Sequence, residues 1–270
     1  MPELPEVEAV RRELEPVMSG ARITGVVLYR DGLRRPFPEN LREELVGQTV
    51  LSMDRRGKYL LAPLSSGTTL VMHLGMSGSF RIERARTTAR QPEKHDHVDI
   101  SLASGSIVVF NDPRRFGVVD LVENSEVGER LGLGPEPLSD DFNATVLARA
   151  CLRSRAPLKS TLMDQHVIAG LGNIYASEAL HRARLSPRRR ASTLVTASGR
   201  PRASAVALAD SVKALLLEAV ARQTGHPSRD SRFRVYDRAG STCTRRGCGG
   251  TIVRIVQGGR SSFFCPRCQR

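Results

Sequence analysis

The chain begins Met1-Pro2-Glu3-Leu4-Pro5-Glu6, which places two prolines and two carboxylates at the start of a predicted helix. Removal of the initiator methionine would leave Pro2 with a free secondary amine. Such an amine condenses with a sugar aldehyde to a cationic iminium, the electron sink of a Schiff-base lyase. Glu3 beside it can donate or accept a proton. Alternatively, both prolines only rigidify a helix start, where proline is well tolerated, and these residues alone favour that interpretation.

Apolar residues follow this start at spacings of three and four, which predicts a helix that ends at Ser19-Gly20. From about Ile23 to Val122 the pattern changes to short β-rich runs that glycine, proline and asparagine separate. We expect strands over residues 23–29, 49–54, 59–61, 69–74, 98–102, 107–111 and 118–122. Several short strands at this spacing are typical of a β-sandwich or barrel.

The second half of the chain has a helical pattern. We interpret the glycine- and proline-rich residues 131–138 as a link between domains, and Ser139-Asp140-Asp141 as the cap of the next helix. Helical spacing continues to about Gln223, with an interruption over 186–202 and an amphipathic helix over 203–220.

Four of the five cysteines lie near the C-terminus, as Cys243-x4-Cys248 and Cys265-x2-Cys268. Two close pairs of thiolates suit one tetrahedral zinc ion, and four protein ligands leave no open position for a substrate. We therefore predict one structural Zn²⁺. The fifth, Cys151, stands alone among alanine and leucine and is interpreted as a buried hydrophobic residue.

The residues between the cysteine pairs predict a β-hairpin. Strands are expected over 251–256 and 262–264, joined across Gln257-Gly258-Gly259-Arg260. Arg260 at the tip is a candidate ligand for a phosphate, because a guanidinium matches phosphate geometry. A solvated turn arginine explains it equally well.

The charge of the chain predicts a polyanionic partner. Lys and Arg number 41 against 28 Asp and Glu, a formal net charge of +13. Nucleic acid is the commonest such partner, although a generally basic proteome would give the same excess. No run approaches the roughly 18 apolar residues of a membrane span, and no apolar signal region follows the N-terminus. We expect a cytoplasmic protein with no membrane partner.

Several loops carry candidate contacts to nucleic acid. Met76 follows a predicted strand, and Arg114 and Phe116 lie in a second turn. Apolar and arginine side chains on loops can fill the gap that a flipped base leaves in a duplex. Alternatively, Met76 and Phe116 belong to the core. Lys58 stands at a strand start, and taken alone it is better interpreted as a surface lysine.

Two further patterns are less specific. Gly170-Leu171-Gly172-Asn173 allows a tight turn, after which Asn173 can begin a helix whose N–H groups face an anion. A purely structural turn is the alternative. We interpret His95-Asp96-His97 as structural, because no third metal ligand is evident nearby.

Together and in this order, the motifs resemble the bacterial formamidopyrimidine-DNA glycosylase family, which includes endonuclease eight. The resemblance covers essentially the whole chain. It rests on Pro2–Val7, Arg56–Tyr59, His73–Gly78, Lys94–His97, Asp112–Gly117, Leu133–Ser139, Gly172–Ala176 and the four paired cysteines.

The resemblance implies an α+β multidomain fold. An N-terminal β-sandwich that begins with the catalytic helix would occupy residues 1–132. A helical DNA-binding domain with a helix–two-turn–helix motif would occupy 133–238, and a β-hairpin zinc finger with four cysteine ligands 239–270. Double-stranded DNA with a damaged base or abasic site would bind in the cleft between the halves, to a monomeric protein.

The resemblance also implies a function, that of a bifunctional DNA glycosylase and abasic-site lyase of base excision repair. It would excise oxidised purines through a Schiff base on Pro2, followed by β,δ-elimination. The implied catalytic residues are Pro2, Glu3 and Lys58, with Glu6 shaping the N-terminal site. The implied DNA-binding residues are His73, Met76, Arg114, Phe116, Asn173 and Arg260, with Arg114 facing the orphan cytosine.

One segment departs from the family pattern. Typical members have a longer, glycine-rich loop where this chain has only residues 221–234, and that loop folds over oxidised guanine. We therefore expect weakened selectivity for 8-oxoguanine and better retained activity on formamidopyrimidines or abasic sites. A non-catalytic DNA-damage-binding protein on the same scaffold is the alternative function, although Pro2, Glu3 and Lys58 argue against it. A zinc-ribbon RNA-binding or transcription factor would leave the N-terminus unexplained.

Overall fold

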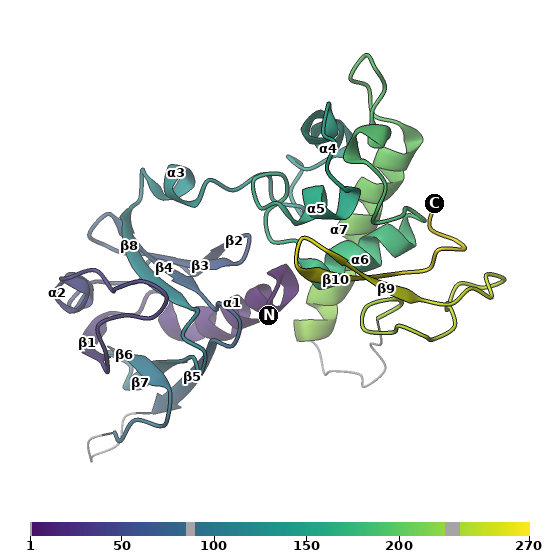
Figure 1. Ribbon diagram of the computed structural model, residues 1–270. Coiled ribbons are helices and arrows are strands. Elements are labelled where there is room, and N and C mark those ends of the chain that lie inside the picture. The colour runs from purple at the N-terminus through teal and green to yellow at the C-terminus, as the bar shows by residue number, and fades with distance from the viewer. Residues whose placement is uncertain (1, 85–89, 225–232) are drawn as a thin grey trace. The chain divides into compact units, whose positions relative to one another are not determined.

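A computed structural model describes residues 2–84, 90–224 and 233–270 of the chain (Figure 1). The chain divides into two compact units, Met1–Gly132 and Leu133–Arg270. Each unit has its own architecture, and the helical residues and the C-terminal hairpin belong to the same unit. The further division of this second unit at residues 238 and 239 stays a prediction.

Two antiparallel sheets of four strands each build the first unit. The first sheet joins, in order, β1 (Ile23–Leu28), β6 (Asp96–Leu102), β7 (Ser106–Asn111) and β5 (Ser79–Arg84). The second joins β2 (Asp54–Arg56), β3 (Tyr59–Pro63), β4 (Thr68–His73) and β8 (Val118–Glu123). Alternate side chains of both sheets, such as Val26, Leu60 and Val98, share one buried apolar core. The predicted sandwich is confirmed.

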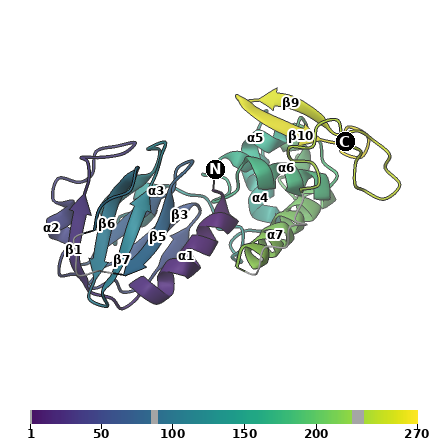
Figure 2. The ribbon, with the colours of Figure 1, turned by 90° about the horizontal axis from the view of Figure 1, so that it is seen from below.

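Helix α1 (Leu4–Met18) packs against this sandwich (Figure 2). Its apolar face contributes Val7, Leu14 and Met18 to the core. Its outer face is held by Glu8, which pairs with Arg55 of β2 at 3.1 Å and with two arginines of its own helix. The helix ends at Met18 and is followed by Gly20 with a φ of +76°, as the sequence predicts.

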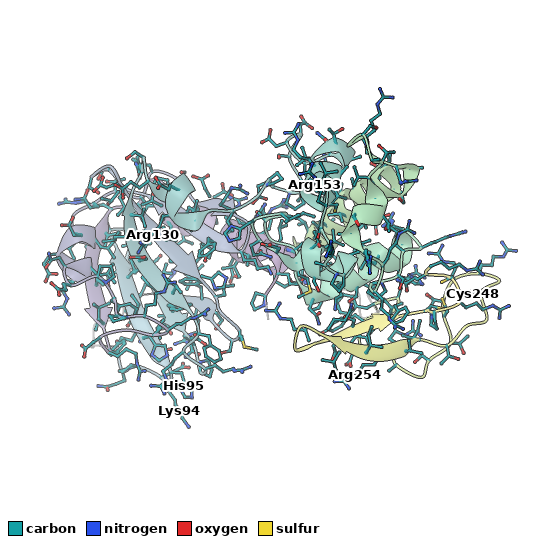
Figure 3. All side chains as sticks on the ribbon, turned by 45° about the horizontal axis from the view of Figure 1, so that its top comes forward. Lys94, His95, Arg130, Arg153, Cys248 and Arg254 are labelled. Carbon is teal, nitrogen blue, oxygen red and sulfur yellow. The ribbon has the colours of Figure 1, made fainter. Side chains whose placement is uncertain are left out.

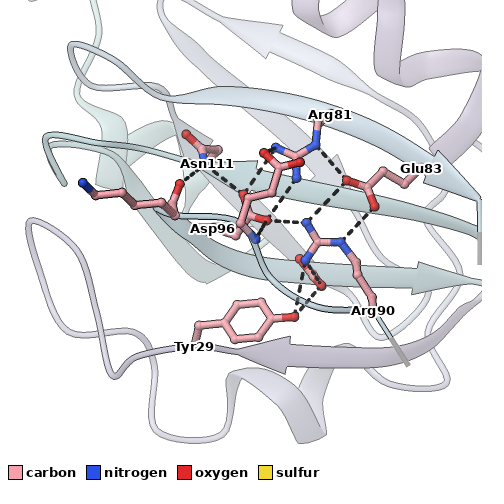
Figure 4. A network of polar contacts seen from close by, with 9 residues as sticks. Tyr29, Arg81, Glu83, Arg90, Asp96 and Asn111 are labelled. Atoms are coloured by element: carbon pink, nitrogen blue, oxygen red, sulfur yellow. Dashed lines mark hydrogen bonds and ion pairs between the residues drawn. The ribbon is translucent and has the colours of Figure 1, made fainter. Parts of the chain in front are cut away.

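Strand β5 was not predicted, because charged residues interrupt its apolar pattern. Phe80 and Ile82 pack on the core, whereas Arg81 and Glu83 form ion pairs on the other face. Arg81 also bonds Asp96, which accepts further bonds from Arg90 and Asn111 (Figure 4). The charges of Arg81 and Glu83 are therefore paired within the fold.

Three more details of the first unit differ from expectation. The short helices α2 (Leu41–Leu45) and α3 (Val127–Leu131) were not predicted. In the expected strand over 49–54, Thr49 and Val50 make only isolated bridges, and the regular ladder begins at Asp54.

The second unit combines helices with a hairpin. Its helical elements are α4 (Ala144–Cys151), α5 (Leu158–Met163), α6 (Asn173–Arg182), a 3₁₀ turn (Ala191–Leu194) and α7 (Ala203–Thr224). Helix α7 packs against α4 and α6 and runs past the predicted end at residue 220. None of the described helices is long and apolar enough to cross a membrane.

The cap of α4 corrects a prediction. Asn143, not the Ser139–Asp141 segment, precedes the helix, and its Oδ1 accepts bonds from the N–H groups of Thr145 and Val146. Asparagine is among the most favourable residues at this position. Ser139 instead closes a turn by bonding the carbonyl oxygen of Glu136.

Strands β9 (Val253–Gln257) and β10 (Arg260–Phe264) form the predicted C-terminal hairpin. Gln257 pairs with Arg260, and the two glycines between them have positive φ angles, as tight hairpin turns require. Val235, Ile252 and Phe263 pack with the cysteines in a small core. So small a core needs additional stabilisation, which a metal ion can supply.

Candidate functional site

The N-terminal site is built by a reciprocal cap at the start of α1. Glu3 is the N-cap residue, and its carboxylate accepts a bond from the N–H of Glu6. The Glu6 carboxylate in turn accepts the N–H of Glu3 at 2.9 Å. This capping box fixes both carboxylates at the positive end of the helix. Glu3 is 1% exposed, and Pro2, half-buried, directly precedes it outside the helix.

Lys58 and His73 lie close together on the second sheet. Tyr59, next to Lys58, pairs with His73 in register, and the two rings lie 4.7 Å apart. Lys58 directly precedes β3 and is buried, which contradicts the surface interpretation. Burial, followed by the charges of Lys58 and Arg34, lowers the pKa of His73 to about 4.

The neutral His73 ring has a defined proton position. Its Nδ1 accepts the N–H of Gly75 at 2.9 Å. The proton therefore resides on Nε2, because neutral imidazole has one donor and one acceptor. Lys58 and the Nε2–H group of His73 are both suited to bind an anionic oxygen.

Met76 and Phe116 sit on two loops that are tied together at their base. A Cβ on Gly75 would lie 2.4 Å from the Phe116 carbonyl carbon, so only glycine permits this approach. Both loop tips remain accessible, since Met76 and Phe116 are each 40% exposed. The interpretation of these two residues as core residues is wrong. Arg114 extends over the Phe116 ring, at 5.2 Å from its centroid.

Asp112, which sequence reasoning did not single out, fastens these loops. This buried carboxylate accepts bonds from the Ser77 hydroxyl and from the backbone N–H groups of Arg114 and Gly117. Its position directly before Pro113 at a turn was the available signal. The bonds leave the tips of a rigid pair of loops free to contact a ligand.

In the second unit, a buried lysine joins the start of α6 to the hairpin. Lys159 is 2% exposed, and its Nζ donates to Asn173 Oδ1 at 2.6 Å. It also donates to the Ser261 carbonyl oxygen and the Ser262 hydroxyl, at 2.9 and 2.8 Å. Lys159 thereby links Asn173 to the strand that begins with the exposed Arg260. Sequence reasoning missed Lys159 because its partners lie on distant segments.

The four paired cysteines converge at the other end of the hairpin, where Figure 3 labels Cys248. Their sulfur atoms all lie within 4.8 Å of one another. The distance is 3.8 Å between Cys243 and Cys268 and 3.6 Å between Cys248 and Cys265. Zn–S bonds of about 2.3 Å in a tetrahedron place sulfurs about 3.8 Å apart. The set fits one structural zinc ion.

The other candidates for metal or thiol chemistry are structural. Among the described residues, no second cluster of histidine, cysteine and carboxylate side chains could hold a metal. His97 is buried and its Nε2 contacts the Asp112 carbonyl oxygen, whereas His95, labelled in Figure 3, is half-buried. Cys151 is fully buried, and burial raises its pKa to about 11, which confirms the hydrophobic interpretation.

Helix α6 also contacts the cysteine-bearing segment. Glu178 accepts the backbone N–H groups of Arg234, Val235 and Tyr236. One turn later, the Nε2 atom of His181 lies 3.4 Å from Cys243 Sγ. Burial, and then the charge of Arg245 above all, lowers the pKa of His181 to about 4. Of the short segment over 221–234, residues 225–232 lie outside the described residues.

Comparison with family models gives three consecutive matches. The model described as the formamidopyrimidine-DNA glycosylase N-terminal domain matches residues 1–119. The model of the corresponding H2TH domain matches residues 133–230. The model described as a zinc finger found in FPG and IleRS matches residues 240–270.

Curated relatives match over the full length of both chains. A formamidopyrimidine-DNA glycosylase of Rhodopseudomonas palustris is 49% identical over 294 aligned residues, and one of Beijerinckia indica is 50% identical over 289. Both alignments cover 100% of each chain.

Solved structures are similar as well. A Lactococcus lactis formamidopyrimidine-DNA glycosylase bound to DNA containing an abasic site has a TM-score of 0.87 at 33% identity, covering 99% of each chain. A complex of the Lactococcus lactis protein with FAPY-dG-containing DNA has a TM-score of 0.86 at 32% identity. That match covers 99% of this chain and 100% of the other.

Proposed function

This chain belongs to the formamidopyrimidine-DNA glycosylase family, and on that premise we propose how it acts as a DNA glycosylase of base excision repair. The Pro2 amine is the proposed nucleophile, and the enzyme both removes a damaged base and cuts the DNA strand. The observation that carries this assignment is the buried Glu3 directly after Pro2, which is held by two reciprocal hydrogen bonds with Glu6. A mere helix start would not require a carboxylate to be buried beside the terminal amine.

The proposed reaction starts with attack of the Pro2 nitrogen on C1′ of the damaged nucleotide. The C1′–base bond breaks, and the base takes up a proton as it leaves. The Pro2 nitrogen gives up its proton, and the C1′–O4′ bond then breaks as O4′ takes up a proton, which leaves an open-chain iminium at C1′. This iminium makes the C2′ proton acidic, so its removal expels the 3′ phosphate. A second elimination expels the 5′ phosphate and leaves a one-nucleotide gap. Glu3 transfers protons at the sugar, while Glu6 holds the Glu3 backbone in place.

Damaged double-stranded DNA is the proposed substrate. Lys58 and the Nε2–H group of His73 would bind its phosphates from the first unit, and a neutral histidine binds equally well throughout the physiological pH range. Asn173 and Arg260, linked through Lys159, would bind phosphates from the second unit. The cationic contacts of Lys58 and Arg260 would release counterions, so each of these two should lower the logarithm of affinity by about 0.9 per decade of salt.

Met76, Arg114 and Phe116 would occupy the space that the flipped nucleotide leaves. Extruding a base costs a few kcal/mol, and apolar side chains inserted into the stack recover part of that cost. The exposed tips of loops that Asp112 holds rigid are suited to this role, because little conformational entropy is lost on insertion. We assign Arg114 to the orphan cytosine.

We further propose that the enzyme is less selective for 8-oxoguanine than long-loop relatives and retains activity on formamidopyrimidines and abasic sites. The Rhodopseudomonas palustris alignment spans 294 positions, 24 more than the 270 residues of this chain. Residues are therefore missing here relative to that protein. Excision rates from 8-oxoguanine and formamidopyrimidine duplexes test the proposal; an 8-oxoguanine rate equal to that of the relative would overturn it.

A catalytic role is distinguished from a purely DNA-binding one by borohydride trapping. The full chain, shown by mass spectrometry to lack Met1, is mixed with abasic-site duplex and reduced. An enzyme that forms an iminium is expected to give a covalent adduct in high yield. Duplex binding without any adduct would favour the non-catalytic binder on the same scaffold.

We also propose that the chain acts as a monomer in the bacterial cytoplasm. Light scattering of the free protein and of its complex with one abasic-site duplex tests the first part. A mass corresponding to two protein chains per duplex would contradict it.

A further inference from the structure

His181 makes a contact that the proposed DNA chemistry does not use. It lies in the last turn of α6, its side chain is 4% exposed, and its Nε2 atom is 3.4 Å from Cys243 Sγ. We propose that His181 is a positioning residue of the zinc site, which donates an N–H···S hydrogen bond to Cys243 and slows the loss of zinc.

The chemistry of the cysteine set fixes the direction of this bond. A zinc-bound cysteine is a thiolate, which has no proton to donate. The histidine must therefore donate, and its Nε2 must hold the ring proton. Because the donor meets a charged acceptor in a buried place, the bond belongs to the stronger, charge-assisted class.

The bond also balances the charge of the site. Four thiolates around one Zn²⁺ carry a net negative charge, which is costly to bury. An N–H donor directed at one sulfur draws electron density from it and stabilises the thiolate. Groups that bond metal ligands in this way orient them and typically change metal affinity by about 10- to 100-fold when removed.

The surrounding contacts show that the His181 contact is part of a docked interface. Arg245, two residues after Cys243, donates its Nη2 to the His181 carbonyl oxygen at 2.6 Å. Glu178, three residues before His181, accepts three N–H groups of residues 234–236. The same helix begins at Asn173. The bond thus joins the metal site to the helix whose first residue is a proposed phosphate ligand.

Zinc release tests the proposal independently of enzyme activity. The zinc-loaded full chain is mixed with excess chromogenic chelator, and the release rate is measured. We expect His181→Phe, which lacks a donor, to release zinc about 10- to 100-fold faster than the parent. His181→Gln places an amide N–H near the position of Nε2 and should restore slow release. Ser177→Ala is the matched control, because it removes a buried bond of α6 that touches no cysteine.

Cobalt substitution supplies a spectroscopic readout that a loss of packing alone would not move. Without the donor, the Cys243 sulfur is more electron-rich, so the thiolate-to-cobalt absorption band should move to lower energy in His181→Phe. The band should stay at the parent position in His181→Gln and Ser177→Ala. If His181→Phe fails to bind one equivalent of metal, His181→Leu, which also lacks a donor, replaces it.

Three results would overturn the proposal. The first is parent-like release and an unmoved cobalt band in the donor-free variant. The second is equally fast release in Ser177→Ala, which would indicate a general effect of α6 packing. The third is a His181→Gln band shifted as far as that of the donor-free variant.

Discussion

The N-terminal site and the cysteine set hold reactive groups in opposite ways. Glu3 and Glu6 are held by bonds between residues three apart, within the first turn of one helix. Cys243 and Cys268 come from separate turns, one before and one after the hairpin in the sequence. A locally held site can lose its chemistry while the fold persists, whereas a site whose metal contributes folding energy loses structure with its ligands. Substitutions should therefore separate loss of catalysis at the N-terminal site from loss of structure at the cysteine set.

The largest expected effect is the loss of catalysis in Glu3→Gln. The amide still accepts the N–H of Glu6, so the cap is kept, but it no longer transfers protons. Single-turnover base excision should fall by about 10²- to 10⁴-fold, with the thermal unfolding midpoint almost unchanged. An equally large fall in the unfolding midpoint would show that Glu3 is mainly structural.

Replacing a zinc ligand should give the reverse pattern. Cys265→Ser removes one of the four thiolates, so the hairpin core around Ile252 and Phe263 loses its metal. Duplex affinity should fall by about 10- to 100-fold, which corresponds to one or two lost charged hydrogen bonds, while the β-sandwich stays folded. Cys151→Ala, outside the set, should keep one zinc per chain. Unchanged affinity in the zinc-free variant would refute the prediction.

Lys159→Met tests whether the link between α6 and the hairpin matters for DNA. The change leaves Asn173 Oδ1 and the Ser262 hydroxyl without their shared donor. Each such loss costs about 1–3 kcal/mol, so we expect roughly tenfold weaker binding to an abasic-site duplex. Lys213→Met is the control, because that lysine bonds only the Ser139 carbonyl oxygen among the interactions described. Equal losses in both variants would indicate a general effect of removing charge.

The last prediction, which applies only at low pH, concerns the loss of stability in acid that the buried His73 causes. Its pKa is about 4 in the folded chain and about 6.5 when unfolded, so only the unfolded state takes up the proton between these values. Folding stability should therefore fall as the pH drops from 6.5 to 4, by up to about 1.4 kcal/mol per pH unit. His73→Gln should remove this part of the dependence in urea unfolding. Parallel pH profiles for both proteins would contradict the assigned pKa.

The sequence predicts most elements whose residues follow a regular pattern. β-branched runs locate six of the eight strands in the two described sheets, and the cysteine spacing predicts the hairpin and its metal site. Strand β5 could not be predicted, because its charged residues Arg81 and Glu83 interrupt the apolar pattern. Their partners, Asp96 and Arg90, lie outside β5. From the sequence alone, a charged residue is expected to face solvent, because the partners that would allow it to lie in a strand are not visible.

The candidate site divides in the same way. Glu3 and Glu6 are adjacent in sequence, so their cap can be predicted from spacing alone. The roles of Lys159, Asp112 and His181 cannot be predicted from spacing, because each residue bonds partners from other elements. For Lys159, burial is tolerable only because three oxygens from two distant segments surround its ammonium group.

The central claim is that Pro2 is the nucleophile, and peptide mapping of the reduced complex tests it most directly. The chain is mixed with abasic-site DNA, reduced with borohydride, digested with nuclease and protease, and analysed by mass spectrometry. We predict that the sugar remnant is attached to the N-terminal peptide, on the nitrogen of Pro2. Attachment to a lysine such as Lys58, with Met1 absent, would contradict the account.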